Sequence, residues 1–210
     1  MKPMPRPARP LDAAAADRLC AVAAAAFATR GLDGASLNGI LSRARMGKGS
    51  FYHRFADKAA LHDWVTERLS TALLREIRPP QPHALTAQDF RDELAALLAR
   101  LGHVALTRPE LLDLGRMFHN SADAPPERAI TTVRRAVNDW LGSVLETGQA
   151  LGTIRTDLPL DLLTALAIAT LTAIDRWALS SENDTATRSA AAATALGVFC
   201  DLIAGGEEAI

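Results

Sequence analysis

The most constraining feature of this 210-residue sequence is segment 36–61, SLNGILSRARMGKGSFYHRFADKAAL. It predicts a short helix at 37–44, a tight turn at 45–47, a second short helix at 48–55 and the start of a third. Ser36 is a good N-cap residue for the first of these helices. A short helix that carries a lysine, small residues, a tyrosine and a histidine suits a DNA major groove.

The composition favours an all-α fold. Hydrophobic residues make up 49% of the sequence, which is enough to bury a core. Alanine, leucine and arginine are abundant and favour helix, whereas strand-like runs of valine, isoleucine and threonine are nearly absent. We expect about nine helices, at residues 12–29, 37–44, 48–55, 58–77, 86–106, 109–119, 126–150, 159–179 and 185–204.

Proline clusters and charge divide the chain into three parts. Residues 1–11 contain four prolines and are expected to form a disordered arm. We expect residues 12–73 to form a three-helix DNA-binding domain with its helix-turn-helix motif at 36–55, and residues 74–210 to form a helical domain, to which the family resemblance given below assigns effector binding and dimerisation. The first 58 residues hold ten Lys/Arg and four Asp, a net charge of +6, so the remainder carries −7. A basic N-terminal part on an acidic body fits contact with phosphate.

Several classes of protein and site lack support in the sequence. Cys20 and Cys200 lie in apolar helical patterns and are expected to be core residues rather than a disulfide. We find no zinc spacing, phosphate-binding loop or nucleophile elbow, so we expect no metal, no cofactor and no catalytic residue. The first ten residues do not resemble a secretory signal, and no uncharged run approaches the ~20 residues that span a bilayer. We therefore expect a cytoplasmic protein.

The second short helix carries most of the expected DNA chemistry. Lys48 begins it, where free backbone N–H groups also favour phosphate. Gly49 and Ser50 lack bulk, so the backbone can approach the groove, and Ser50 can hydrogen-bond a base edge. Tyr52 and His53 can bond phosphate oxygens, which position the protein without specifying sequence. The candidate DNA-binding residues are Ser36, Leu37, Arg45, Lys48, Gly49, Ser50, Tyr52, His53 and Lys58.

The order and spacing of fifteen residues resemble the TetR family of transcriptional repressors over about residues 13–73. Three positions depart from the family pattern: Leu41 replaces a small residue, Arg45 replaces a turn glycine, and Gly47 replaces a Ser or Thr cap. We therefore expect a mildly strained backbone at Arg45 and a weak cap on the following helix. The resemblance is carried by Phe27, Gly31, Ser36, Leu37, Ile40, Ala44, Lys48, Gly49, Ser50, Phe51, Tyr52, His53, Phe55, Lys58 and Leu61.

The resemblance implies a homodimer that binds a palindromic operator and is released by a small-molecule effector held among the helices of the body. Ordinary core packing is the alternative for each aromatic residue, and a surface or core position is the alternative for each histidine. An activator is an equally open outcome, because repression depends on where the operator lies. The candidate effector-pocket residues are Trp64, His103, Met117, Phe118, His119, Asn138, Trp140, Asp175 and Trp177.

The helices at 159–179 and 185–204 are too apolar to be satisfied by one neighbour. Apolar faces that wrap around a helix must be buried on more than one side, so we infer that this pair meets its own copy across a two-fold axis. Burial inside the chain is the alternative. The candidate interface residues are Leu163, Leu166, Thr170, Ile174, Ala192, Leu196 and Phe199.

The alternative function for the whole chain is a non-specific DNA-architectural or protein-binding module without an effector response.

Overall fold

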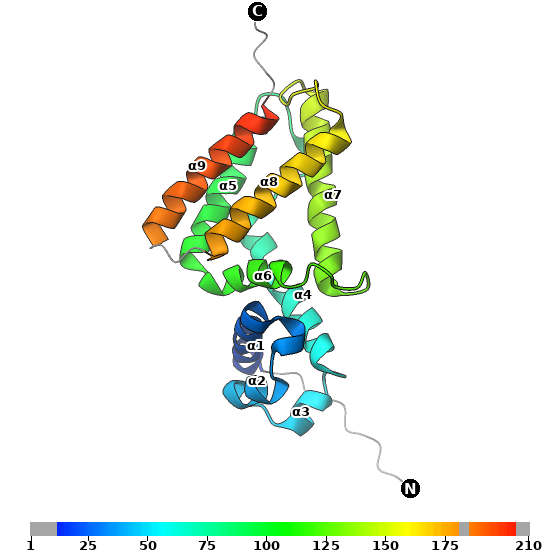
Figure 1. The fold of residues 1–210 in the computed structure, drawn as a ribbon, viewed down its shortest axis with the longest axis vertical. Coiled ribbons are helices and arrows are strands. Elements are labelled where there is room, and N and C mark those ends of the chain that lie inside the picture. The colour runs from blue at the N-terminus through cyan, green and yellow to red at the C-terminus, as the bar shows by residue number, and fades with distance from the viewer. Residues whose placement is uncertain (1–11, 181–184, 205–210) are drawn as a thin grey trace, which may run out of the picture.

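The computed structural model describes residues 12–180 and 185–204, and for residues 180 and 185–193 it describes only the backbone (Figure 1). The all-α prediction is confirmed for this part of the chain, whereas the arm at 1–11 lies outside it. The helices are α1 (Ala13–Gly34), α2 (Leu37–Ala44), α3 (Lys48–Tyr52), α4 (Lys58–Ile77), the short 3₁₀ helix η1 (Pro82–Ala84), α5 (Phe90–Thr107), α6 (Pro109–His119), α7 (Ala129–Ala150), α8 (Leu160–Ser180) and α9 (Thr185–Ile203).

Helices α1–α3 form an N-terminal unit at one end of the molecule, and α4 connects it to the body, α5–α9 (Figure 1). Helix α1 has the predicted break at Gly31, whose φ of 66° and ψ of 179° interrupt the helix. Helix α3 is shorter than predicted, because the chain turns after Tyr52. Helix α7 begins at Ala129 rather than 126, after a turn closed by a hydrogen bond from the Arg128 N–H to the Pro125 carbonyl.

One hydrophobic cluster joins the N-terminal unit to the body. It contains the fully buried Phe27, Phe51 and Leu61, and it extends to Met117 of α6 and Ile130 of α7. Because these side chains share a core, a shift of α6 has to be accommodated by α1 and α4. Met117 was predicted in an effector pocket, but it has no exposed surface and packs in this cluster.

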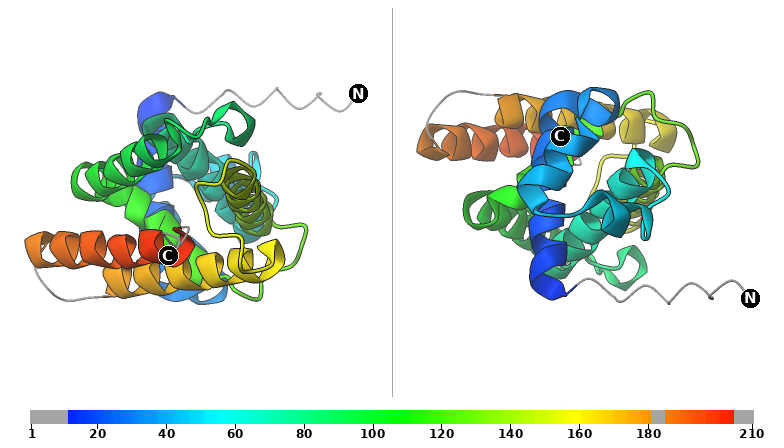
Figure 2. Two further views of the ribbon diagram at one scale, coloured as in Figure 1. Left: turned by 90° about the horizontal axis from the view of Figure 1, so that it is seen from above. Right: turned by 90° about the horizontal axis from the view of Figure 1, so that it is seen from below.

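A second cluster lies within the body and joins α5, α7, α8 and α9. Leu163 is fully buried in it and Phe199 is 6% exposed. Both residues were predicted at the dimer interface, whereas the structure packs their side chains inside their own chain. Figure 2 shows α8 and α9 side by side along one edge of the body. Both cysteines are free; Cys20 is buried as expected, but Cys200 is exposed.

Polar contacts also fix the joint between α4 and the body. The Arg128 guanidinium donates to Asp63 Oδ1 at 3.0 Å and to the Ala59 carbonyl at 2.9 Å. The Asn120 amide donates to the Ala28 carbonyl of α1 at 2.6 Å. The end of α6 and the start of α7 are therefore tied directly to α1 and α4.

His62 is buried at this joint. Its ring lies edge-on to Phe27 with ring centroids 4.9 Å apart, and its Nδ1 has no hydrogen-bond partner among the residues that the structure describes. Burial, and secondarily the charge of Arg128, lowers the pKa of His62 to about 4, although Asp63 opposes the shift. The imidazole is therefore neutral in the folded protein at neutral pH.

Gly148 of α7 sits where no side chain fits. A Cβ at this position would lie 2.5 Å from Ile154 Cδ1 and 2.7 Å from Phe90 Cζ. Both neighbours are buried, so neither can move without disturbing the second cluster.

We expect Gly148→Ala to destabilise the protein by about 1–3 kcal/mol, as overpacking does. The matched change Gly142→Ala, where the nearest atom is 3.9 Å away, should stabilise α7 by up to ~1 kcal/mol. Thermal unfolding of both variants at equal concentration checks the pair, and equal midpoints would contradict the packing argument.

The buried His62 predicts a specific pH dependence. The unfolded chain binds a proton near pH 6.5, whereas the folded chain does so only near pH 4, so stability falls as pH drops through this window. The loss approaches about 1.4 kcal/mol per pH unit for one group. Urea unfolding between pH 7 and 4.5 should show a shallower fall for His62→Phe than for the native sequence. Parallel curves would show that His62 is not the titrating group.

Candidate DNA-binding surface

The helix-turn-helix is built by local capping and by a left-handed turn. Ser36 Oγ accepts a hydrogen bond from the Gly39 N–H at 3.2 Å and caps α2. Arg45 follows α2 with φ 55° and ψ 42°, and its N–H returns to the Ser42 carbonyl at 3.1 Å. The left-handed conformation predicted from the missing turn glycine is thus present. Leu41, the other bulky departure, is accommodated because it is 3% exposed in the core.

Helix α3 is anchored by aromatic residues on its inner side. Phe51 is fully buried and stacks on Phe55 with ring centroids 5.3 Å apart. Phe55 in turn meets Trp64 of α4 edge-on at 5.6 Å. With Phe51 turned inward, the remaining positions of this short helix have to face solvent.

The outward side of α3 holds most of the predicted contacts. Lys48, Gly49, Ser50 and His53 are exposed, and Tyr52 is 59% exposed with its ring edge-on to Phe51 at 5.0 Å. Gly47 provides no side-chain cap, as expected from the sequence. The N–H groups at the start of α3 are thus left without a side-chain acceptor and can bond a phosphate.

Positive charge on this side of the molecule is uncompensated. Arg43, Arg45 and Lys48 are exposed, and none of them forms an ion pair with the described residues. Lys58 differs, because its ammonium donates to the Asp33 and Ala35 carbonyls at 2.9 Å each. It ties α4 to the chain before α2, and one N–H is left for a phosphate.

Leu37 and Arg18 help to shape this surface through contacts within the N-terminal unit. Leu37 is half-buried against the core of the N-terminal unit. Arg18 of α1, which sequence reasoning missed, donates to the Ala44 carbonyl at the end of α2 at 3.1 Å. No local sequence signal links Arg18 to Ala44, because the two residues are 26 positions apart.

A separate pocket of about 440 Å³ lies between α6, α7 and α8. It brings together four of the predicted effector residues, Phe118, His119, Asn138 and Asp175. His119 Nε2 lies 2.8 Å from Asp175 Oδ2 and links α6 to α8. The sequence prediction missed lining residues that recur at helical spacing on α7 and α8, namely Arg134, Val137, Ile168, Leu171 and Thr172.

The other predicted effector residues lie elsewhere. His103 is exposed on α5, and Trp177 is 41% exposed on α8. Trp140 packs against the second cluster and donates its indole N–H to the Pro80 carbonyl at 2.9 Å. Trp64 lines a different pocket, between α1, α4 and α6. None of these four lines the pocket between α6, α7 and α8, because their helices place them on other sides.

Comparison with known proteins supports both the motif and the fold. Residues 19–63 match the model of bacterial regulatory proteins of the tetR family. A tetR-family regulatory protein from Rhodococcus RHA1 is 20% identical, with a TM-score of 0.68 over 93% of this chain and 100% of that one. The ketosteroid transcriptional regulator KstR2 of Mycobacterium tuberculosis is 22% identical, with a TM-score of 0.67 over 95% and 99%. A TetR-family regulator from Agrobacterium tumefaciens is 19% identical, with a TM-score of 0.67 over 91% and 98%. No curated protein sequence matches the chain.

The left-handed turn predicts opposite effects for two neighbouring substitutions. Arg45→Gly removes the steric cost of a left-handed L-residue, about 1–2 kcal/mol, partly offset by the entropy of glycine in the unfolded chain. We expect a net gain in stability of about 0.5–1 kcal/mol. Arg43→Gly, two residues earlier in the last turn of α2, should instead cost up to ~1 kcal/mol. Urea unfolding checks both, and a loss of stability in Arg45→Gly would show that the turn is unstrained.

Proposed function

From a chain that carries a tetR-family DNA-binding domain at residues 19–63 and has the fold of TetR-family regulators, we propose that this protein is an effector-responsive transcriptional repressor. In this proposal a homodimer binds a palindromic operator and a small molecule releases it. The observation that carries the proposal is the exposed, uncompensated basic side of α2 and α3, held outward by the burial of Phe51. The role is one of binding rather than catalysis, and the protein acts in the cytoplasm, where the operator is accessible.

The proposed DNA contacts divide by chemistry. Lys48 and Tyr52 bond phosphates and set the position of α3 in the major groove. Ser50, the smallest polar side chain on the exposed side, approaches a base edge. One short helix contacts few base pairs, so specificity requires two copies about one DNA turn, ~34 Å, or more apart.

The proposed dimer uses the outer side of α8 and α9. Helix α8 is long and apolar enough over Leu160–Leu179 to qualify as a membrane span by length and composition, yet only 11% of that segment is buried within the chain. It also carries Asp175 and Arg176, which disfavour a lipid environment. An exposed apolar side on a helix that packs against α6, α7 and α9 instead suits a second copy of this chain.

Two of the predicted interface residues, Leu163 and Phe199, are buried, and each lies next to an exposed apolar residue. Leu162 is 47% exposed and Leu166 37%, while Val198 of α9 is 61% exposed. Leu166 is therefore retained from the predicted set, and Leu162 takes the place of Leu163. Thr170, Ile174 and Leu196 are half-exposed at the border of this side. The side chain of Ala192 lies outside the described residues.

The effector is proposed to bind the pocket between α6, α7 and α8. Phe118, Val137 and Leu171 offer apolar contacts, whereas the His119–Asp175 pair offers hydrogen bonds. A ligand that separates α6 from α8 acts on α1, because α6 shares the core of the N-terminal unit and is followed by Asn120, which bonds Ala28. Release from DNA then follows as a population shift, provided that the ligand binds the released form a few kcal/mol more tightly.

Selection of bound duplexes from random DNA tests the proposal. A palindromic consensus supports it, and retention of duplexes without sequence preference favours a DNA-architectural role instead. The selected duplex then serves for all binding measurements.

Substitutions on α3 should separate position from specificity. We expect Lys48→Ala and Tyr52→Ala to weaken binding to the selected duplex and to unrelated duplexes by similar factors, because phosphate contacts carry no sequence information. Lys48→Ala should also reduce the slope of the logarithm of the binding constant against the logarithm of the salt concentration, by about one for each copy of Lys48 that contacts a phosphate. Arg135→Ala, an exposed cation of α7 in the body, should bind as the native sequence does. Unchanged affinity in both α3 variants would show that α3 is not the contacting helix.

A further inference from the structure

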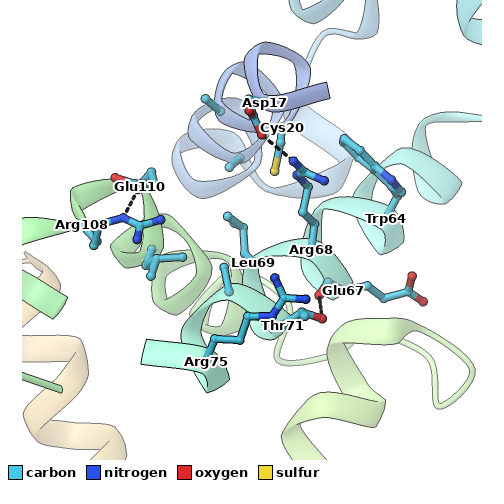
Figure 3. A pocket seen from close by; sticks show the side chains of 14 residues that line it. Asp17, Cys20, Trp64, Glu67, Arg68, Leu69, Thr71, Arg75, Arg108 and Glu110 are labelled. Carbon is cyan, nitrogen blue, oxygen red and sulfur yellow. Dashed lines mark hydrogen bonds and ion pairs between the residues drawn. The ribbon is translucent and has the colours of Figure 1, made fainter. Parts of the chain in front are cut away.

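A second pocket of the described chain lies apart from the α6–α7–α8 pocket. It encloses about 880 Å³ where α1, α4 and the start of α6 meet (Figure 3). The proposed DNA contacts and the proposed effector use none of its residues. Its position on both the N-terminal unit and the body makes it a candidate for a second ligand.

The floor of this pocket is apolar. Cys20 and Ala24 of α1 are 4% and 1% exposed, and Leu69 of α4 and Leu111 of α6 are 5% and 4% exposed. Burial raises the pKa of the Cys20 thiol to about 11, so this sulfur is a neutral apolar surface. Trp64 adds a half-buried indole at one end of the pocket. A ligand that fills this space has to present an apolar or aromatic body.

Most of the charges around the floor already have partners. Arg68 pairs with Asp17 at 2.5 Å, across the gap between α4 and α1. Arg108 pairs with Glu76 at 2.6 Å and with Glu110 at 2.5 Å. The side-chain hydrogen bond from Arg108 holds the pKa of Glu110 below its ordinary value. Because Arg68 and Arg108 are both held in these ion pairs, neither guanidinium is left without a carboxylate partner.

Arg75 is the exception. It lines the pocket from α4, and its guanidinium forms no hydrogen bond or ion pair within the described part of the chain. Figure 3 shows its side chain running back along α4 toward Leu69 and Thr71, whereas the Glu67 carboxylate points away from it. A guanidinium beside an apolar floor, with no carboxylate bound to it, suits an organic anion.

Spacing along α4 sets the shape of the ligand. Arg75 follows Trp64 by eleven residues, about 16 Å of helix, and the arginine side chain extends back over part of this distance. We propose that the pocket binds an elongated aromatic anion, with its acidic group on Arg75 and its rings over Leu69 toward Trp64. Trp64 also contacts Phe55, with ring centroids 5.6 Å apart. The aromatic end of the ligand would thus lie one ring away from the packing that holds α3.

Titration with 8-anilinonaphthalene-1-sulfonate, an elongated aromatic anion that fluoresces when bound, tests the site on the full chain. Arg75→Gln should weaken its affinity about fivefold, the size of one partly exposed charge pair. Ala21→Phe, at an exposed lining position on α1, should weaken it at least as much by filling the space. Thermal unfolding verifies that each variant is folded, and the two changes act independently, so one failed variant leaves the other informative.

Matched changes in the other pocket provide the control. Arg176→Gln and Ala122→Phe alter an arginine and an alanine that line the α6–α7–α8 pocket, and they should leave the binding that depends on Arg75 unchanged. Probe affinity that is insensitive to both Arg75→Gln and Ala21→Phe would overturn the proposal. So would affinity that falls only in the Arg176 and Ala122 variants. Because no DNA is present, either result leaves the proposed repressor function untouched.

Discussion

The burial of Phe51 determines what the rest of this molecule can do. Helix α3 has only five residues, too few to hold a direction by its own hydrogen bonds. A fully buried phenylalanine contributes about 1.5–3 kcal/mol and fixes which side of α3 faces outward. The stack on Phe55 and the edge contact with Trp64 extend this anchor to α4. The exposure of Lys48, and with it the proposed DNA contact, is therefore a consequence of core packing.

The same core explains how a distant ligand can influence α3. Helix α6 contributes Leu114 and Met117 to the cluster that contains Phe51, and Asn120 beyond it bonds α1. A close-packed cluster transmits a displacement because it has few voids to absorb it. Both proposed pockets border helices of this cluster, the one through α6 and the other through α1 and α4. The proposed regulation by ligands therefore rests on this shared packing, whatever the identity of the ligands.

The sequence predicted the local features well and the long-range ones poorly. Capping by Ser36 and the left-handed Arg45 depend on neighbours within a few residues, and both are found in the structure. The effector-pocket residues depend on which sides of different helices face one another. Four of the nine predicted residues therefore line the pocket between α6, α7 and α8, and lining residues such as Arg134 were missed. The sequence did not show that Leu163 faces inward, because an almost uniformly apolar helix gives no periodic signal that separates its inner side from its outer side.

The central claim is that α3 is presented twice, at a separation fixed by a pair of α8 and α9 helices. An electron–electron distance between nitroxide labels on Ser42→Cys, an exposed site of α2 beside α3, measures it most directly. Cys200 is exposed and has to be replaced by serine, whereas the buried Cys20, with its raised thiol pKa, can remain. We expect a single intersubunit distance, whose distribution becomes narrower when the selected duplex is added. Absence of any dipolar coupling with the duplex saturated would show that single copies bind DNA and would contradict the account.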